Sequence, residues 1–404
     1  LKPFVITDLS SDLTTTPALS NKLAADAGLD IKYGITQNLT ADFTVNTDFA
    51  QVEADEQQIN LTRFSLFFPE KREFFLENQG LFTFGGAGAG PFGGGDTPVM
   101  FYSRRIGLNK GREVPIDMGG RVTGRVGAFS VGLLNIQTGD EPVSAVEATN
   151  FTVVRVKRDL LRRSSIGAIA TRRSLSTTGL GSSETYGLDG TFGFYDALNI
   201  NTYWAETRTP GLGGDTVSYR TQLDYTGDRY GLQLERLVVG NDFNPEVGFL
   251  RRLAFERSVA SARFSPRPQA IAAIRKLSWS GRVGYITDRA GVLETRDVEG
   301  QFEIEFESSD QINLSYTDTY ENLTQDERIT GAMISAGRYP FGSVQASYSF
   351  GPQRFLSGNV SARYGTFYHG RLASAGISRG RIEVIPQLSL EPSVSYNWVD
   401  LPGH

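Results

Sequence analysis

The sequence predicts an all-β fold, a transmembrane antiparallel up-and-down β-barrel of roughly 20 or more strands. Three observations predict it. Apolar and polar residues alternate with a period of two along most of the chain. No apolar run reaches the ~20 residues that a transmembrane helix needs. The 404 residues include 45 Gly, 16 Tyr and 26 Phe, which suit tight turns and the membrane–water interfaces of a barrel.

The alternation is clearest in two runs, 301–307 and 387–398. A soluble β-sandwich also alternates, but so many long strands would need an unusually large pair of sheets. The polar faces here also carry Ser, Thr, Asn, Gln, Glu and Arg rather than Lys, as in a hydrated lumen. In the first run the apolar face holds Phe302, Ile304 and Phe306, and the polar face holds Glu303, Glu305 and Glu307.

Many alternating runs are ~9–12 residues long, which matches a tilted strand that crosses the hydrocarbon layer. Short breaks such as 226–229, 308–310 and 339–342 separate them, so we expect neighbouring strands to form antiparallel hairpins. No segment has a helical period. The expected strands lie near 1–7, 22–33, 39–48, 99–106, 117–125, 127–137, 149–158, 164–173, 184–194, 197–206, 216–226, 229–239, 252–264, 274–286, 294–308, 311–321, 329–338, 343–350, 354–366, 368–378 and 385–399.

Residues 47–98 break the pattern, because dense charges are interleaved with phenylalanines and followed by a Gly-rich stretch. Burying these charges in lipid would be costly. We therefore expect one barrel over 1–404 in which 47–98 fold into the lumen or onto the rim and narrow or plug the pore. Arg104, Arg105, Arg121 and Arg125 are the expected charge partners on the wall. The pore or plug candidates are Asp48, Glu53, Asp55, Arg63, Glu70, Lys71, Arg72, Glu77, Arg104, Arg105, Glu303, Glu305 and Glu307.

The same segment carries a family resemblance. Its motifs are 45–55, 60–64, 67–72, 74–77 and 101–107, and a second patch covers 242–249. Together they closely resemble an uncharacterised outer-membrane β-barrel family whose members commonly carry an N-terminal carbohydrate-binding-module-like domain. The resemblance implies a barrel and gives no established activity.

Two departures from that family are expected. No sugar-binding-like domain precedes the barrel in this sequence. The last strand candidate also runs into residues 399–404, where Asp, Pro and Gly indicate a turn, so we expect the barrel to be incomplete at its C-terminus.

Catalytic and metal chemistry has little support in the sequence. The histidines are His369, which lies at an apparent hairpin turn, and His404. A Ser–His–acid hydrolase needs a histidine held by a carboxylate, and zinc needs His or Cys clusters. The Gly-rich stretch 85–95 lacks the Gly-Lys-Ser/Thr ending of a phosphate loop. Asp48, Glu53, Asp55 and Glu56 fit no EF-hand spacing. We expect no enzyme activity, cofactor or metal.

The glutamates at 303, 305 and 307 have two interpretations. They are typical of a hydrated lumen wall, and they also suit a cation-favouring stripe in a conducting pore. Adjacent like charges repel, so we expect arginines nearby, with Arg282 and Arg338 as candidates.

The leading functional hypothesis is a porin-like barrel in the bacterial outer membrane that passes polar solutes or gates their passage. The alternatives are a structural or surface-anchoring barrel that serves as a scaffold for partner proteins, and an outer-membrane hydrolase. We expect outer-membrane lipid as a partner, and cell-envelope proteins for the scaffold. Basic and acidic residues are interspersed, 40 and 45 in number, so no basic stripe for nucleic acid is expected. Oligomeric state stays open.

Overall fold

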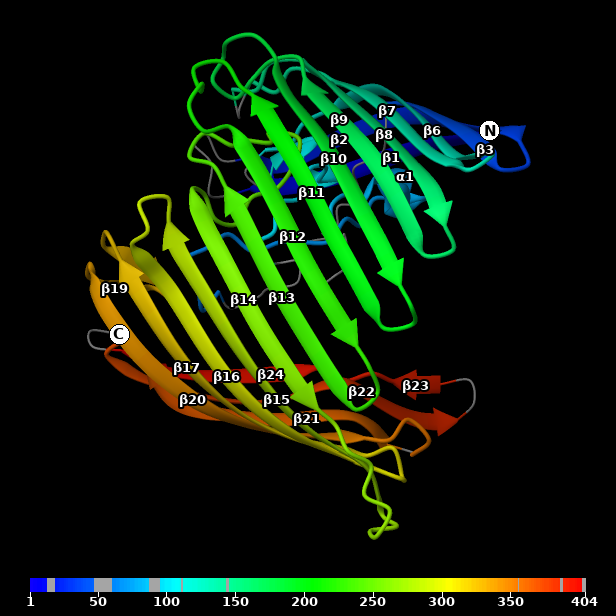
Figure 1. Ribbon diagram of the computed structural model, residues 1–404. Coiled ribbons are helices and arrows are strands. Elements are labelled where there is room, and N and C mark those ends of the chain that lie inside the picture. Colours follow the sequence, from blue (N-terminus) through cyan, green and yellow to red (C-terminus); the bar gives the residue numbers. More distant parts are fainter. Residues whose placement is uncertain are drawn as a thin grey trace.

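The protein forms one large antiparallel sheet of 20 strands, which curves into a barrel-like wall (Figure 1). The wall surrounds an inner segment, residues 60–86 and 95–109, which lies between β3 and β6 in the sequence. The computed structural model describes residues 1–12, 19–46, 60–86, 95–109, 112–142, 145–354, 356–385 and 388–401. The helices within these ranges are short, and none has the length and apolar character needed to cross a membrane. The predicted all-β class and the antiparallel order are confirmed.

The strands of the main sheet follow the chain. They are β1 (Lys2–Asp12), β2 (Leu19–Thr36), β3 (Leu39–Val45), β6 (Ile116–Val126), β7 (Phe129–Thr138), β8 (Thr149–Leu161), β9 (Ser164–Arg173), β10 (Ser183–Phe194), β11 (Leu198–Arg208), β12 (Val217–Thr226), β13 (Tyr230–Val239), β14 (Phe255–Phe264), β15 (Ile274–Asp288), β16 (Leu293–Phe306), β17 (Gln311–Leu323), β20 (Gly337–Phe350), β21 (Leu356–Phe367), β22 (Gly370–Ile385), β23 (Leu388–Leu390) and β24 (Val394–Asp400).

The remaining elements are small. They are α1 (Glu73–Leu76), the 3-10 helices η1 (Gln79–Phe82) and η2 (Ser103–Arg105), and the short hairpins β4 (Leu108–Asn109) with β5 (Arg112–Glu113) and β18 (Glu327–Ile329) with β19 (Ala332–Ile334).

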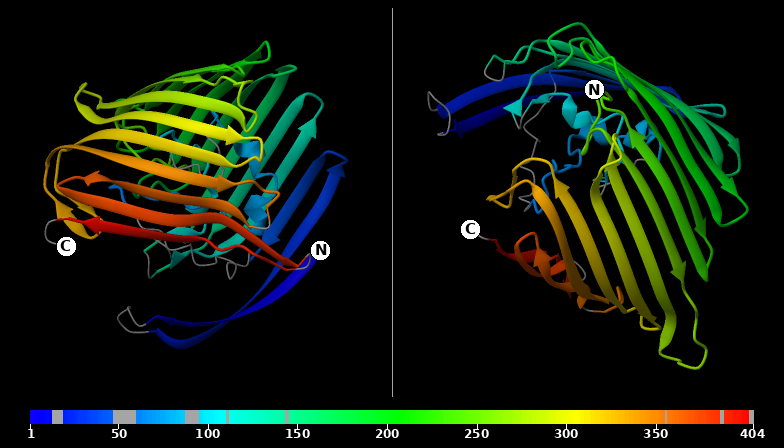
Figure 2. Two further views of the ribbon diagram at one scale, coloured as in Figure 1. Left: turned by 90° about the horizontal axis from the view of Figure 1, so that it is seen from below. Right: turned by 60° about the vertical axis from the view of Figure 1, so that its left-hand side comes forward.

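The main sheet has an up-and-down order in which each strand pairs with its neighbour in sequence. Three pairings pass over intervening elements: β3 pairs with β6, β17 pairs with β20, and β22, which also pairs with β23, pairs with β24. β1 and β24 lie at opposite edges of the sheet, and no pairing joins these two strands within the described residues. Figure 2 shows the two chain ends at these edges.

The register separates an apolar outer face from a polar inner face. Trp279 pairs with Phe302, and Phe302 pairs with Leu314, so these side chains share the outer face of β15, β16 and β17. At the next position of β16, Glu303 pairs with Asn313 of β17, and both side chains lie on the inner face. Because successive strand residues point to opposite faces, the alternation in the sequence becomes this division.

Aromatic side chains on the outer face gather at two levels. Trp279 and Tyr285 of β15 mark these levels six positions apart, which is about 20 Å along a strand. At one level the rings of Tyr230, Phe264, Trp279 and Phe302 form a row across β13 to β16, with centroids 5.5, 6.1 and 5.1 Å apart. Near the opposite strand ends, the exposed aromatic residues include Tyr186, Trp204, Tyr219, Tyr285 and Tyr364.

The two ends of the wall differ in their connections. One end has mostly long connections, such as 174–182, 240–254 and 324–336, and the other has mostly short turns, such as 127–128 and 162–163. The chain between β3 and β6 leaves and rejoins the wall at the long-connection end, where Val45 pairs with Met118. The inner segment therefore enters the barrel from that end.

Three expected strands are wrong. Residues 99–106 form no wall strand, because they pack inside the barrel and include η2. Residues 329–338 divide among the end of β18, β19 and the start of β20, and the turn expected at 339–342 lies within β20. Pro340 is tolerated there because β20 pairs with β21 only from Ser343 onward. The strand expected over 385–399 is interrupted between β23 and β24, where Pro392 has no N–H to donate.

Candidate functional site

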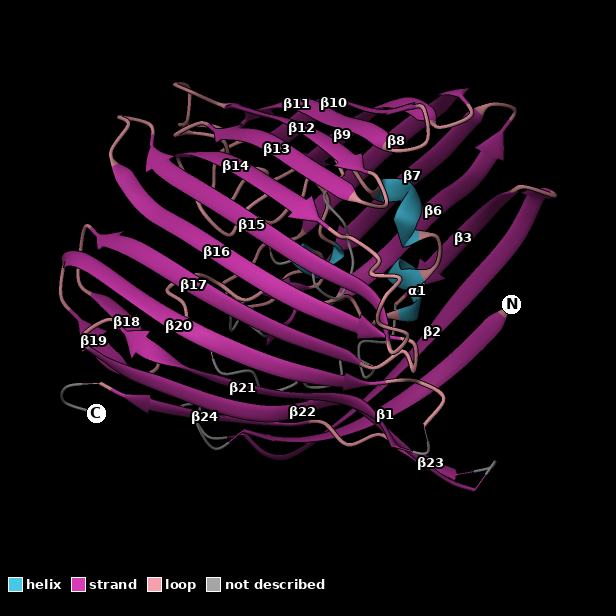
Figure 3. Ribbon diagram, turned by 60° about the horizontal axis from the view of Figure 1, so that its bottom comes forward, coloured by secondary structure: helices cyan, strands magenta, loops and turns pink. Residues whose placement is uncertain are grey.

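The inner segment, residues 60–86 and 95–109, lies against the inner face of the wall (Figure 3). It contains α1, η1 and η2 but no strand of the main sheet. Figure 2 shows it between the β6–β14 side and the β16–β22 side. Of the predicted plug 47–98, residues 47–59 and 87–94 lie outside the described residues, and Asp48, Glu53, Asp55 and Glu56 fall among them.

Two hydrophobic clusters attach the inner segment to one side of the wall. In the first, Phe75, Phe82 and Ile106 pack against wall residues that include Leu134 and Phe151. In the second, inner-segment residues pack against the inner face of β9, β11, β13, β14 and β15; its buried members are Phe84, Met100, Ile169, Tyr203, Ala205, Leu237, Val239, Phe243, Phe255 and Ile286. The phenylalanines of the inner segment therefore form a hydrophobic core together with apolar residues of the wall. A polar lumen surface could not form such a core alone.

A series of buried wall arginines also binds the inner segment. The first, Arg121 of β6, forms an ion pair with Asp42 of β3 at 2.7 Å. It also donates to the carbonyl oxygens of Phe74 and Glu77, the latter at 2.6 Å. Its side chain is 3% exposed. The prediction that Arg121 is a wall partner of this segment is confirmed.

The next two arginines lie further along the wall. Arg155 of β8 forms a bidentate ion pair with Asp189 of β10, both contacts at 2.7 Å, and donates to the carbonyl oxygen of Thr83 at 3.0 Å. Arg220 of β12 pairs with Glu235 at 2.6 Å and donates to the carbonyl oxygen of Gly85 at 3.1 Å. In each case a wall acid neutralises the arginine while free N–H groups reach the backbone of the segment.

Arg257 of β14 completes the series. It shares Glu235 at 2.6 Å and reaches Asp96 at 3.4 Å and the Thr97 hydroxyl at 3.1 Å. Sequence reasoning missed Arg155, Arg220 and Arg257. The alternation gives no signal for them, because Arg155 shares its strand face with Phe151 and Val153, and Arg257 shares its face with Phe255 and Val259.

Within the inner segment, Glu70 and Arg72 form a buried bidentate pair. The contacts are 2.8 and 2.6 Å long, and the side chains are 5% and 3% exposed. Arg72 also donates to the carbonyl oxygens of Ser103 and Ile106, and the Ser103 hydroxyl donates to Glu70 at 2.6 Å. Burial by itself raises the pKa of Glu70, but the hydrogen bonds from Arg72 and Ser103 hold that pKa below its ordinary value of 4.5.

The two sequence patches that carry the family resemblance contact each other. Val99 and Phe249 form an antiparallel bridge with backbone hydrogen bonds of 3.0 and 2.8 Å. The Tyr102 N–H donates to the carbonyl oxygen of Val247, and Arg105 Nε donates to that of Gly248 at 3.0 Å. The 240–254 connection therefore closes over residues 99–105.

At its other end the inner segment meets the opposite side of the wall. Arg63 lies 3.8 Å from Glu294 of β16 and 3.7 Å from Glu321 of β17. Leu61 packs against a third hydrophobic cluster that includes Leu323 and Phe367. These ion-pair contacts are longer than those of the wall arginines, so the segment spans the interior but is held less closely on this side.

Several predicted site residues have other positions or partners. Arg104 and Arg105 belong to the inner segment and not to the wall, and Arg104 donates to the carbonyl oxygen of Pro69 at 3.1 Å. Arg125 pairs with Asp159, and both side chains are about half exposed. Lys71 is half-buried beside Glu70. Glu77 pairs with Lys32 of β2 and lies 3.4 Å from Arg121.

The glutamate stripe is shorter than expected. Glu303 and Glu305 lie on the inner face of β16, and Glu307 lies in the following turn. The arginine beside them is Arg275, which reaches Glu305 at 2.9 Å and Glu307 at 3.5 Å. The expected partners Arg282 and Arg338 are wrong, because they pair across the sheet with positions 299 and 322 instead.

The described residues contain no group of three His, Cys, Asp or Glu side chains that could hold a metal. His369 is exposed in the turn between β21 and β22, and its ring lies 4.7 Å from that of Tyr339. The predicted turn position of His369 is confirmed.

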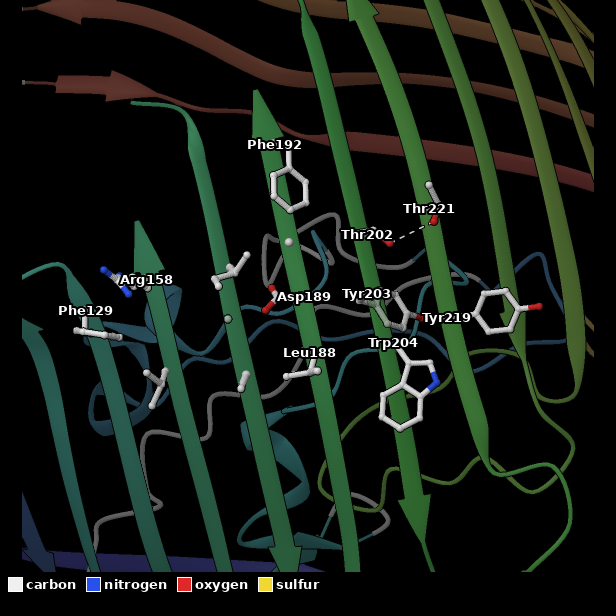
Figure 4. Close-up of a pocket in the computed structure, with 15 residues that line it drawn as sticks. Phe129, Arg158, Leu188, Asp189, Phe192, Thr202, Tyr203, Trp204, Tyr219 and Thr221 are labelled. Carbon is white, nitrogen blue, oxygen red and sulfur yellow. Dashed lines mark hydrogen bonds between the residues drawn. The ribbon is translucent and has the colours of Figure 1, made fainter. Parts of the chain in front are cut away.

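A large hollow lies on the outer face and not in the lumen (Figure 4). Its volume is about 870 Å³, and its walls include Phe129, Leu188, Phe192, Trp204 and Tyr219. Because these are outward-facing residues of β7 to β12, the hollow faces the surroundings of the barrel and is not the site of the inner segment.

A family model described as a domain of unknown function, DUF5916, matches residues 1–121. No curated protein matches. The crystal structure of OccAB3 from Acinetobacter baumannii matches with 11% identity and a TM-score of 0.43, over 76% of this chain and 91% of that one. The family match includes residues 45–107, which carry the resemblance seen in the sequence.

Proposed function

We propose that this protein is a barrel of the bacterial outer membrane that passes polar solutes or gates their passage, with the inner segment as its constriction. The outer face supports the membrane location, because an apolar band between two aromatic levels is what a lipid-embedded barrel presents. In lipid, unpaired strand edges are costly, so the proposal requires that the edges β1 and β24 be covered in the membrane.

The observation that carries this proposal is the inner segment itself. It is bound by Arg121, Arg155, Arg220 and Arg257 on one side and reaches Glu294 and Glu321 on the other, so it crosses the space that a solute would use. In bacterial barrels the longer loops face the cell exterior. The segment therefore enters from the exterior, as a loop that constricts the pore.

A scaffold is the second candidate, and the two hydrophobic clusters favour it. Phe75, Phe82 and Phe84 are each at most 6% exposed, as in the core of a soluble domain. A segment packed so closely suits a permanently closed barrel that holds partner proteins of the cell envelope. Neither candidate assigns a catalytic step to the chain.

Single-channel conductance in a planar bilayer tests the choice. We would compare the intact protein with a variant in which residues 51–98 are replaced by a short Gly-Ser linker. Steady conductance of the intact protein supports a diffusion pore, and silence that becomes conductance on deletion supports gating. Silence in both folded proteins supports the scaffold. A deletion of 268–271, an exposed connection at the other end, is the matched control and leaves conductance unchanged.

A further inference from the structure

A polar cavity of about 420 Å³ lies at the long-connection end of the wall. Its walls come from the inner segment within 105–109, from the ends of β7, β8 and β9, and from the connections that follow β7 and β9. Arg105, Asn109, Arg173 and Ser176 contribute polar side chains. The volume is within the range of about 300–1,000 Å³ that small-molecule sites occupy.

Two arginines line this cavity, and each has N–H groups without a partner in the described part of the chain. Arg173 Nε is buried and has no hydrogen-bond partner. Its Nη1 lies 3.9 Å from Glu246, which is too long for a hydrogen bond. Arg105 uses only Nε, which donates to the carbonyl oxygen of Gly248. A buried donor without a partner is unfavourable, so Arg173 has capacity for a further acceptor, and the exposed guanidinium of Arg105 can reach the same acceptor from the open side of the cavity.

The acids near these arginines do not satisfy them. Glu246 is buried, but its oxygens already accept hydrogen bonds from the Ser176 hydroxyl at 2.7 Å and from the Thr177 N–H and hydroxyl at 2.9 and 2.8 Å. Glu147 lies exposed at the edge of the cavity. Arg105 and Arg173 are also close enough for their positive charges to repel, and a bound anion would relieve this repulsion.

We propose that this cavity binds a small oxyanion, a carboxylate or a phosphate, between the guanidinium groups of Arg105 and Arg173. Guanidinium forks match two oxygens of such a group and remain charged at all relevant pH values. The Asn109 amide, which also lines the cavity, offers a further donor. The site goes beyond the proposed function, because anion binding here does not require that the barrel conducts.

Isothermal titration calorimetry of the folded protein in detergent tests the site, with succinate, inorganic phosphate and uncharged glucose as probes. We expect saturable binding of succinate, of phosphate or of both, and no binding of glucose. Arg105→Gln and Arg173→Gln each weaken anion binding about tenfold or more, because each removes charge-assisted hydrogen bonds. Tighter binding of succinate assigns the site to carboxylates, and tighter binding of inorganic phosphate assigns it to phosphates.

Arg172→Gln is the matched control. Arg172 adjoins Arg173 in β9 but points to the opposite face, where its side chain is 59% exposed, so its loss leaves binding unchanged. Arg105 is also exposed, so Arg105→Gln keeps the test valid if Arg173→Gln fails to fold. The proposal is overturned if neither anion binds at millimolar concentration, if Arg105→Gln binds like the wild type, or if Arg172→Gln weakens binding equally.

Discussion

Arg121 and Arg125 lie on the same strand of the wall, yet their environments give them different energetic roles. Arg121 is 3% exposed and satisfies Asp42 and two carbonyl oxygens of the inner segment, whereas Arg125 is 56% exposed beside Asp159. An exposed pair contributes ~0–1 kcal/mol. Removal of one partner of a buried pair costs ~3–5 kcal/mol, because the other charge stays buried.

We therefore expect Arg121→Ala to destabilise the folded barrel by about 3–5 kcal/mol and Arg125→Ala by less than about 1 kcal/mol. Urea unfolding in detergent micelles, followed by tryptophan fluorescence, measures both. Equal losses in the two variants would show that the contacts of Arg121 with the inner segment contribute no more than a surface ion pair.

Glu70 gives the inner segment a dependence on pH. Its pKa is lower in the folded protein than its ordinary value of 4.5, so its ionised form stabilises the fold. This stabilisation is complete above pH 4.5 and is lost as the pH falls below that value. We expect limited proteolysis between residues 60 and 109 to accelerate below pH 4.5. Glu70→Gln accelerates cleavage at neutral pH and flattens the pH profile; a profile that is unchanged in this variant contradicts the assignment.

Among the structural elements, the 240–254 connection depends on a glycine. A Cβ atom on Gly248 would lie 2.1 Å from the carbonyl oxygen of Val99, a backbone atom that cannot move aside alone. Gly248→Ala therefore separates the two strands of the Val99–Phe249 bridge. We expect a loss of about 1–3 kcal/mol in the free energy of unfolding and faster proteolysis at residues 99–105.

Gly213 provides the comparison for this substitution. A Cβ there meets no atom within 4 Å, so Gly213→Ala changes the free energy of unfolding by less than about 1 kcal/mol. If the Gly248→Ala protein is as stable as the Gly213→Ala protein, the contact with residues 99–105 does not hold the 240–254 connection in place.

The alternation in the sequence predicts most wall strands, because successive residues of a strand point to opposite faces of the sheet and the two faces here differ in polarity. It could not exclude 99–106 from the wall, since an extended stretch packed inside the barrel has the same local pattern. It also could not pair Arg155 with Asp189, because they join across an intervening strand and their contact depends on register. Arg121 was predictable as a partner of the inner segment, whereas the identity of its carbonyl acceptors was not.

At the scale of the whole molecule, the three tryptophans test the orientation of the wall. Trp204, Trp279 and Trp398 are 42%, 44% and 67% exposed, and the register places all of them on the outer face. An outer face in lipid predicts strong quenching of tryptophan fluorescence by brominated phospholipids and weak quenching by aqueous iodide. Unbrominated vesicles are the control. Strong iodide quenching with no effect of bromination would place the outer face in water and overturn the membrane barrel.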